Sequence, residues 1–237
     1  MNILVTGASR GIGYELVKTF ASRGNCRIIA LSRNDDRLKA LAEYCSVNFP
    51  SSQVIPFPFD LYQKKLIVSS LYEHVSRHFD QLDILVNNAG FLVNKPFTET
   101  DLPDIQQMID INFLAPALIV RVLKPILGRQ AKSHIVNISS MGGVQGSVKF
   151  AGLSYYSATK SALATLTECL AEEFKSENIA VNCVALGAVQ TEMLEKAFPG
   201  YIASITAEEL SESLADFCIR GMDYCNGKIL PFSLSTP

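Results

Sequence analysis

Tyr156 and Lys160 have the side-chain types and the spacing that proton transfer requires. They begin and end the segment Tyr156-Ser157-Ala158-Thr159-Lys160, which precedes apolar residues at helical spacing. Residues four apart share one face of a helix. A phenol has an unperturbed pKa of about 10, so at neutral pH it transfers protons poorly unless a cation stabilises the phenolate. We expect Lys160 to be that cation; the alternative is a chance pairing, because the segment is short.

A strand end and a helix kink offer two further candidate catalytic groups. Ser139-Ser140 follows the apolar run 135–138, and open parallel sheets place their chemistry at the carboxyl ends of strands. Pro116 lies inside the predicted helix 104–127. Because proline lacks an N–H, the carbonyl of Asn112 loses its helical partner. We expect a kink there and an ordered water at that carbonyl.

A glycine-rich turn near the start of the chain indicates a dinucleotide site. The apolar run 2–6 leads into a turn with three glycines, and apolar residues then recur at helical spacing. Glycines let the backbone approach a pyrophosphate, and the free N–H groups of a helix N-terminus attract that anion. A glycine triad alone is a weak signal, but the strand before it and the helix after it strengthen the interpretation. The expected contacts are Gly7, Ser9, Arg10, Gly11, Ile12 and Gly13.

The end of the second predicted strand favours NADP over NAD. Strand 27–31 ends at Ser32-Arg33, where an NAD-binding unit usually carries an acid for the ribose 2′-hydroxyl, and no acid stands there. Ser32 can donate to a 2′-phosphate, and Arg33 and Arg10 can pair with it. The alternative for Arg33 is a solvated residue ahead of the next helix. We therefore expect NADPH to bind more tightly than NADH.

Two more segments follow predicted strands and would line the same site. Asp60-Leu61 comes after strand 53–57, where an exposed carboxylate can hold the adenine amino group. Asn87-Asn88-Ala89-Gly90 comes after strand 84–86, and its small residues let a cofactor lie close to the backbone. We expect cofactor contacts from Asp60, Leu61, Asn87, Ala89 and Gly90.

Strands and helices alternate along the whole chain. Further strands are predicted at 179–185 and 227–232, and further helices at 35–46, 62–79, 155–175 and 207–219. The chain has 237 residues, 48% of them hydrophobic, and shows neither a linker nor a repeat. This pattern predicts an α/β fold: a single doubly wound (Rossmann) domain over residues 1–237, with a mostly parallel central sheet of about seven strands and helices on both faces.

Charge and composition argue against several classes of protein. A net charge of -2 and the lack of a long Lys or Arg run argue against nucleic-acid binding. The longest apolar stretch, 113–127, contains charged residues and prolines, so no membrane span is expected. The six cysteines lack metal-binding spacings and are typical of reduced thiols, so we expect a cytoplasmic protein without a metal site.

These motifs together resemble the short-chain dehydrogenase/reductase family in its compact form. The matching segments are TGASRGIG, NNAG, the Asn112 helix, NISS, YSATK and VQT, in the family's order over nearly the whole chain. The resemblance implies that Ser140 binds the substrate carbonyl, Tyr156 is the general acid/base, Lys160 binds the nicotinamide ribose and lowers the tyrosine pKa, and Asn112 holds a relay water. It also implies cofactor contacts from Tyr156, Lys160, Gly187, Val189 and Thr191.

The resemblance favours an NADPH-dependent carbonyl reductase, acting on a small-molecule ketone or aldehyde. A 3-oxoacyl-[acyl carrier] reductase and a non-catalytic NADP-binding sensor are the alternatives. An apolar substrate is expected because the candidate pocket residues are mostly apolar. They are Phe91, Leu92, Met141, Val148, Phe150, Met193 and Phe198.

Several departures from the family pattern affect the substrate site and assembly. Leu186 replaces the usual proline, the Ser140-to-Tyr156 spacing of sixteen residues is wide, and the lid between Met193 and Thr206 is short. The wide spacing predicts that residues 146–153 form a substrate-side loop. The tail, which ends in Phe232-Ser233-Leu234-Ser235-Thr236-Pro237, also differs from the family's. A homodimer or homotetramer is expected, since Leu118, Val122, Leu163 and Leu166 exceed what one sheet face needs.

Overall fold

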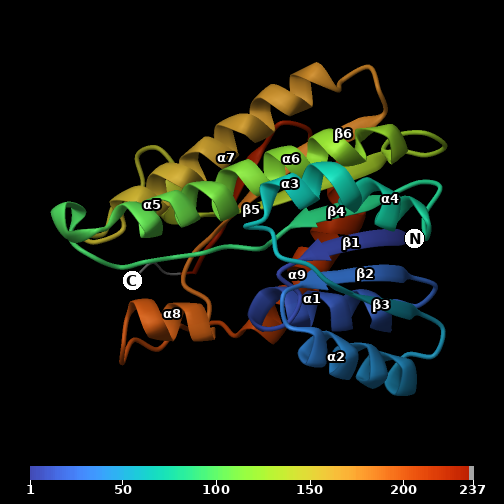
Figure 1. Cartoon of the computed structure of the whole chain (residues 1–237), viewed down its shortest axis with the longest axis horizontal. Helices are drawn as coiled ribbons and strands as arrows, with labels where there is room; N and C mark the ends of the chain where they lie inside the picture. Colours follow the sequence, from blue (N-terminus) through green and yellow to red (C-terminus); the bar gives the residue numbers. More distant parts are fainter. Residues whose placement is uncertain (235–237) are drawn as a thin grey trace.

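Seven parallel strands form one sheet in the order β3-β2-β1-β4-β5-β6-β7. The computed structural model describes residues 1–234, so the last three residues of the divergent tail lie outside the described part. Figure 1 shows the strands with helices on both sides. The predicted doubly wound α/β fold is thereby confirmed. The strands are β1 (Asn2–Thr6), β2 (Arg27–Ser32), β3 (Gln53–Pro58), β4 (Ile84–Asn87), β5 (Ser133–Ser140), β6 (Ile179–Leu186) and β7 (Ile229–Phe232).

The continuous apolar runs of the strands arise because helices cover both faces of the sheet. In β1, Ile3 and Val5 belong to one buried cluster and Leu4 to the other. The first cluster is shared with α1 (Gly11–Ser22), α2 (Asp35–Asn48) and α9 (Ala207–Arg220). The second is shared with α4 (Tyr72–Ser76), α6 (Ala115–Leu123) and α7 (Ser154–Glu173). A strand buried on both faces has no polar side to alternate with, as observed.

Two of the predicted helices are each interrupted by a π-helical turn. The predicted helix 62–79 is α3 (Lys64–Leu66), a π turn at Ile67–Leu71, and α4. The predicted helix 104–127 is α5 (Leu102–Ile109), a π turn at Asp110–Leu114, and α6. The kink expected at Asn112 therefore takes the form of a wider turn, in which Asn112 itself is fully buried. π turns of this kind are frequent at functional sites.

A buried carboxylate fixes the second π turn. Asp110 is completely buried, and its Oδ2 lies 2.7 Å from the Lys64 ammonium while its Oδ1 accepts a 3.0 Å hydrogen bond from Gln106. Lys64 stands at the start of α3, in the segment that follows β3. The pair therefore joins the loop at one end of the sheet to the helix that carries Asn112.

Only some of the apolar side chains that we expected at a subunit contact lie at the surface of α6 and α7. Leu163 is buried within the chain, so its proposed place at a subunit contact is wrong: it packs inward from α7. Leu118, Val122 and Leu166 are partly buried, and Leu166 lines a shallow depression between the two helices. None of the helices in residues 1–234 is long and apolar enough to cross a membrane.

Candidate active site

A cavity of about 680 Å³ opens at the carboxyl ends of the parallel strands. Residues that follow β1, β2, β3, β4, β5 and β6 all contribute to its wall, as open α/β sheets place their ligand sites. The sixth contribution includes α8 (Glu192–Ala197), a short helix that the sequence did not predict. The predicted site residues on this wall are Gly7, Ser9, Arg10, Gly11, Ile12, Ser32, Arg33, Asp60, Leu61, Ala89, Gly90, Ser140, Tyr156, Lys160, Gly187, Val189 and Thr191.

Three predicted site residues support the wall from behind. A Cβ on Gly13 would lie 2.5 Å from the Gly7 carbonyl oxygen, so glycine is needed there for α1 to pack against the turn. Asn87 is buried and donates a 2.8 Å hydrogen bond to Asn137 on the neighbouring strand. Asn112 is buried as well. These residues act on the site through packing and hydrogen bonds to its lining.

Asn88 and Thr6, which are not among the predicted site residues, hold the glycine-rich turn against β4. The Thr6 hydroxyl accepts hydrogen bonds from the backbone N–H groups of Asn88 and Ala89, each at 3.0 Å. The Asn88 side chain donates back to the Thr6 carbonyl at 2.9 Å. Gly7 and Gly11 adopt φ values of 71° and 56°, which favour glycine. The sequence shows two adjacent amides, Asn87 and Asn88, and nothing in it indicates which of them makes this contact.

Ser140 and Tyr156 meet at the floor of the cavity. Ser140 ends β5, Tyr156 lies in the first turn of α7, and the Ser140 hydroxyl is close enough to the phenol to offset part of the rise in its pKa. The close approach of α7 has an evident cause: a Cβ on Gly143 would lie 2.8 Å from the backbone of Lys160. The Ser139 hydroxyl also donates to the Lys160 carbonyl at 2.8 Å, so Ser139 supports the packing as expected.

Lys160 stands beside the tyrosine but does not contact its hydroxyl group in the structure. Its Nζ donates to the Ile138 carbonyl at 2.8 Å and lies 5.9 Å from the centre of the Tyr156 ring. Burial lowers the pKa of Lys160 to about 8. Burial also raises the pKa of Tyr156 to about 12, while the neighbouring Ser140 hydroxyl acts in the opposite direction. The lowering of the phenol pKa that we expected from Lys160 is not seen, because removing the phenolate from water raises the pKa by more than Ser140 lowers it.

Gly90 lines the space of the cavity that lies beside Lys160 and Asn112. A Cβ there would lie 3.6 Å from both Lys160 Nζ and Asn112 Oδ1, and 3.8 Å from the Met193 methyl carbon. The Asn112 amide holds the adjoining loop, accepting from the Phe91 N–H and donating to the Phe91 carbonyl, both at 2.8 Å. The space fits the predicted nicotinamide end of a dinucleotide. The ordered water at the Asn112 carbonyl stays a prediction.

The opposite end of the cavity is rich in arginine. Ser32 and Arg33 line it as predicted, and Arg37, which the sequence prediction missed, joins them from the first turn of α2. Arg10 forms an ion pair with Glu192 of α8. Arg33 lies ahead of α2 and Arg37 lies inside it, so no regular spacing in the sequence relates their positions. This end fits a phosphorylated adenosine.

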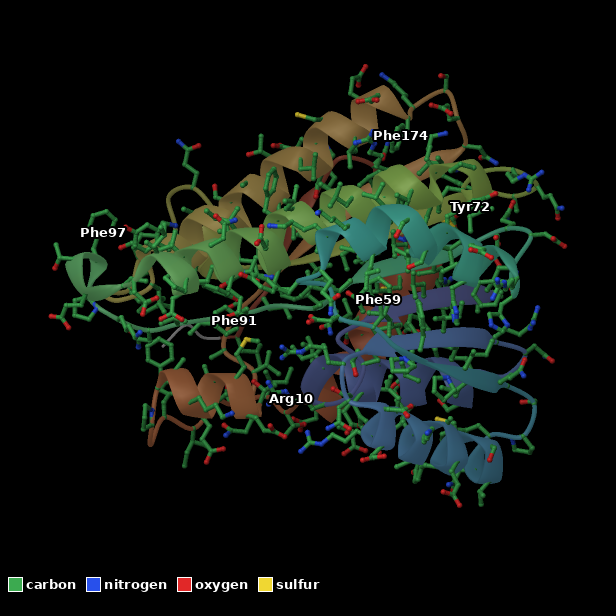
Figure 2. The ribbon with its side chains drawn as sticks, in the orientation of Figure 1. Arg10, Phe59, Tyr72, Phe91, Phe97 and Phe174 are labelled. Carbon is green, nitrogen blue, oxygen red and sulfur yellow. The ribbon has the colours of Figure 1, made fainter. Side chains whose placement is uncertain are left out.

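The end of the cavity where we expect the substrate is apolar. The loops that follow β4, β5 and β6 line it. Six of the seven predicted pocket residues line the cavity: Phe91, Leu92, Met141, Phe150, Met193 and Phe198. Val148 points outward and is 65% exposed. The Phe150 and Phe198 rings meet edge to face, with centroids 6.3 Å apart. Figure 2 shows Phe91 on the segment that follows β4, which passes below α5 and above α8 in this view.

Two hydrogen bonds join these loops. Asn94, after β4, donates its side-chain amide to the Ala197 carbonyl at the end of α8 at 2.7 Å. The backbone N–H of Lys95 donates to the Gly152 carbonyl at 3.2 Å. Residues 146–153 therefore form the predicted substrate-side loop, and the short lid still reaches across the cavity.

A family model described as short chain dehydrogenase matches residues 1–201. The chain belongs to that family. Among related short-chain dehydrogenases, the 3-oxoacyl-[acyl-carrier-protein] reductase FabG of Aquifex aeolicus is 34% identical over 237 residues, which cover 96% of this chain and 93% of the relative. A tropinone reductase homolog of Arabidopsis thaliana is 32% identical over 241 residues, covering 96% and 88%.

Solved short-chain dehydrogenase structures have the same architecture. L-sorbose reductase from Gluconobacter frateurii, in complex with NADPH and L-sorbose, superposes with a TM-score of 0.86 and 26% identity over 100% of this chain and 97% of that one. A short chain dehydrogenase from Escherichia coli in complex with NADPH gives a TM-score of 0.87 and 27% identity, covering 97% and 95%. This chain is therefore an oxidoreductase of the short-chain dehydrogenase family.

Proposed function

We propose that this short-chain dehydrogenase is an NADPH-dependent carbonyl reductase that acts on apolar ketones or aldehydes. The observation that carries the proposal is the placement of Ser140, Tyr156 and Lys160 together on the cavity wall, with the Lys160 ammonium 5.9 Å from the centre of the Tyr156 ring. A protein that only bound the dinucleotide would have no need of a phenol placed beside a serine at the end of a strand. This argues against the alternative of a non-catalytic NADP sensor.

The chain's own residues would supply proton transfer and orientation. The chemistry that NADP(H) supplies when bound is hydride transfer to or from the carbonyl carbon. Ser140 would donate a hydrogen bond to the substrate oxygen and hold it next to the phenol. Tyr156 would then protonate that oxygen, and its phenolate would be stabilised by the nearby Lys160 ammonium. General acid catalysis of this kind contributes about 10²–10⁴ in rate.

Two observations support NADPH as the preferred cofactor. Ser32, Arg33 and Arg37 line the adenosine end of the cavity, and no acid stands at the end of β2. The two structural neighbours described above were solved with NADPH. Arginine pairs with phosphate through two parallel hydrogen bonds, which a ribose hydroxyl cannot match.

The lining of the substrate end supports an uncharged, apolar substrate. Its side chains are mainly aromatic or aliphatic, and the Phe150–Phe198 pair stands at the loops that close it. Burying a charged substrate there without a partner would cost free energy. A second candidate, reduction of a 3-oxoacyl thioester, is favoured by the similarity to the Aquifex aeolicus reductase over nearly the whole chain.

Replacing the phenol tests the proposed reaction. In Tyr156→Phe, we expect NADPH binding to persist while turnover falls at least a hundredfold, since the general acid is lost. Tyr155→Phe is the matched control: Tyr155 stacks on Phe97 through its ring, with centroids 5.0 Å apart, and should retain activity. The assay is NADPH oxidation with free ketones, aldehydes and 3-oxoacyl thioesters. Full activity in Tyr156→Phe would reject the assignment.

We further propose that residues 1–237 work as one catalytic unit, in the cytoplasm, as a homodimer or homotetramer. The six cysteines are all free, which supports a reducing compartment. Leu166 and Leu170 line an apolar depression between α6 and α7 that a second copy could cover. Light scattering at micromolar concentration tests the assembly, and a mass near that of one chain would reject it.

A further inference from the structure

Three charged side chains from distant parts of the chain meet on the arginine-rich wall of the cavity. Arg10 comes from the glycine-rich turn, Arg37 from the first turn of α2, and Glu192 from the start of α8. Glu192 Oε2 lies 2.5 Å from an Arg10 guanidinium nitrogen, and its Oε1 lies 3.3 Å from one of Arg37. Each carboxylate oxygen therefore engages a different guanidinium. In Figure 2, Arg10 is labelled on the side of α1 that faces α8.

This arrangement places an anion where the chain otherwise collects cations. Arg33 lines the same wall, and no ion-pair partner of Arg33 occurs within residues 1–234. Glu192 is ionised, since its hydrogen bond with Arg10, aided by Arg37, lowers the pKa of its carboxyl group. A carboxylate and a phosphate both bind the planar guanidinium fork. Two of the three arginines thus already hold an internal anion.

We propose that Glu192 competes with the cofactor 2′-phosphate for Arg10 and Arg37, and so limits the preference for NADPH over NADH. The inference rests on the proposed NADPH dependence. When Arg10 or Arg37 joins Arg33 in binding a 2′-phosphate, that guanidinium is drawn away from Glu192, and the carboxylate then remains close to a dianion. Both effects weaken binding of the phosphorylated nucleotide only. An adenosine without the 2′-phosphate makes no such demand.

Calorimetric binding of two nucleotide fragments tests the competition without turnover. The probes are adenosine 2′,5′-bisphosphate and adenosine 5′-phosphate. In Glu192→Gln, the bisphosphate should bind roughly three- to tenfold more tightly, the range expected for releasing two exposed ion pairs. The affinity for adenosine 5′-phosphate should stay within about twofold of the wild type. Glu192→Asp keeps the charge and should remain close to the wild type for both probes.

Glu195→Gln is the matched control. Glu195 lies on the same short helix and is exposed, and the ion pairs of residues 1–234 do not include it. Its replacement changes the net charge by the same amount and should leave both affinities unchanged. An equal gain in Glu195→Gln would show that general charge, and not competition at the arginines, controls binding.

The remaining outcomes separate this inference from the proposed function. Unchanged or weaker bisphosphate binding in Glu192→Gln would overturn the competition. A similar gain for both probes would overturn it as well, since adenosine 5′-phosphate carries no 2′-phosphate. If the wild type bound the two probes equally while Glu192→Gln preferred the bisphosphate, the competition would hold and the proposed NADPH preference of the natural chain would be rejected.

Discussion

The Lys160 ammonium donates its hydrogen bond to the backbone carbonyl of Ile138, 2.8 Å away. Lys160 is only 3% exposed, and this carbonyl lies on β5, the strand that ends in Ser140. The strand that presents Ser140 thus also fixes the charged end of Lys160. The charge is held close to the reacting groups at a cost in folding free energy, because a buried ammonium loses its hydration.

That cost gives a prediction for Lys160→Met. The pKa of Lys160 falls from 10.5 to about 8 on folding, so the cost is fully present below pH 8 and disappears above pH 10.5. It amounts to about 3 kcal/mol at neutral pH, from which the lost hydrogen bond subtracts about 1 kcal/mol. We expect the variant to unfold at higher urea concentration than the wild type. The chain has no tryptophan, so circular dichroism is the suitable probe. A less stable variant would contradict the prediction.

His134 should make the fold sensitive to acid. Burial lowers its pKa from 6.5 to about 4. Its Nδ1 lies 2.8 Å from the Cys218 carbonyl and its Nε2 lies 2.9 Å from the Asn182 amide nitrogen, an arrangement that suits only the neutral ring. The unfolded chain takes up the proton first as pH falls, so this stability is complete above pH 6.5 and is lost between 6.5 and 4.

The measurement is urea unfolding of wild type and His134→Gln at several pH values. The wild type should lose up to about 3 kcal/mol more than the variant across that window. His78→Gln, at a partly exposed position outside this network, should keep the wild-type dependence. Parallel losses in wild type and His134→Gln would show that other groups cause the acid sensitivity.

The ion pair between Lys64 and Asp110 should be important for folding. Lys64→Met leaves the fully buried Asp110 carboxylate with Gln106 as its remaining side-chain partner. Because the Lys64 side chain is 40% exposed, we expect a loss of about 1–3 kcal/mol, less than for a fully buried pair. Adding Asp110→Asn should recover part of it, and Lys65→Met, at the exposed neighbouring position, should be neutral. Equal stability of all variants in urea would refute the prediction.

Arg33 should determine cofactor affinity through charge. Arg33→Ala is expected to raise the NADPH dissociation constant roughly tenfold, the lower limit for a charged hydrogen bond, because the side chain is exposed. NADH affinity should change little. Arg23→Ala removes an arginine that pairs with Glu212 and Asp216 on α9 and serves as the control. Fluorescence titration with both nucleotides gives the answer, and unchanged NADPH binding would exclude Arg33 from the phosphate site.

Much of this architecture could be predicted because its signals are local. Burial on both faces of the sheet requires apolar runs such as Ile3–Val5. The turn requires glycine at Gly7 and Gly11 because both have positive φ angles. The spacing of Tyr156 and Lys160 is fixed by the helix itself. Ser139-Ser140 could be placed at the site because the pair follows an apolar strand, and the family resemblance then singled out Ser140.

The remainder depends on contacts between distant segments. Glu192 and Arg10 are 182 residues apart, and an exposed glutamate after a threonine gives no sign of its partner. The direction of the Tyr156 pKa shift depends on how completely the fold excludes water from the phenol, which the spacing to Lys160 does not reveal. The surface position predicted for Leu163 is wrong because helical periodicity alone does not distinguish an intrachain contact from a subunit contact.

Two contacts hold helix α8 in place. The ion pair between Glu192 and Arg10 holds its first turn, and the hydrogen bond from the Asn94 amide to the Ala197 carbonyl holds its end. With both contacts in place, we expect the entry of a bulky substrate to require movement of the helix, whereas a small ketone should pass without it. Lid opening would then compete with hydride transfer as the slow step. A deuterium isotope effect measured with labelled NADPH would accordingly be large for small carbonyl compounds and would shrink as the substrate grows.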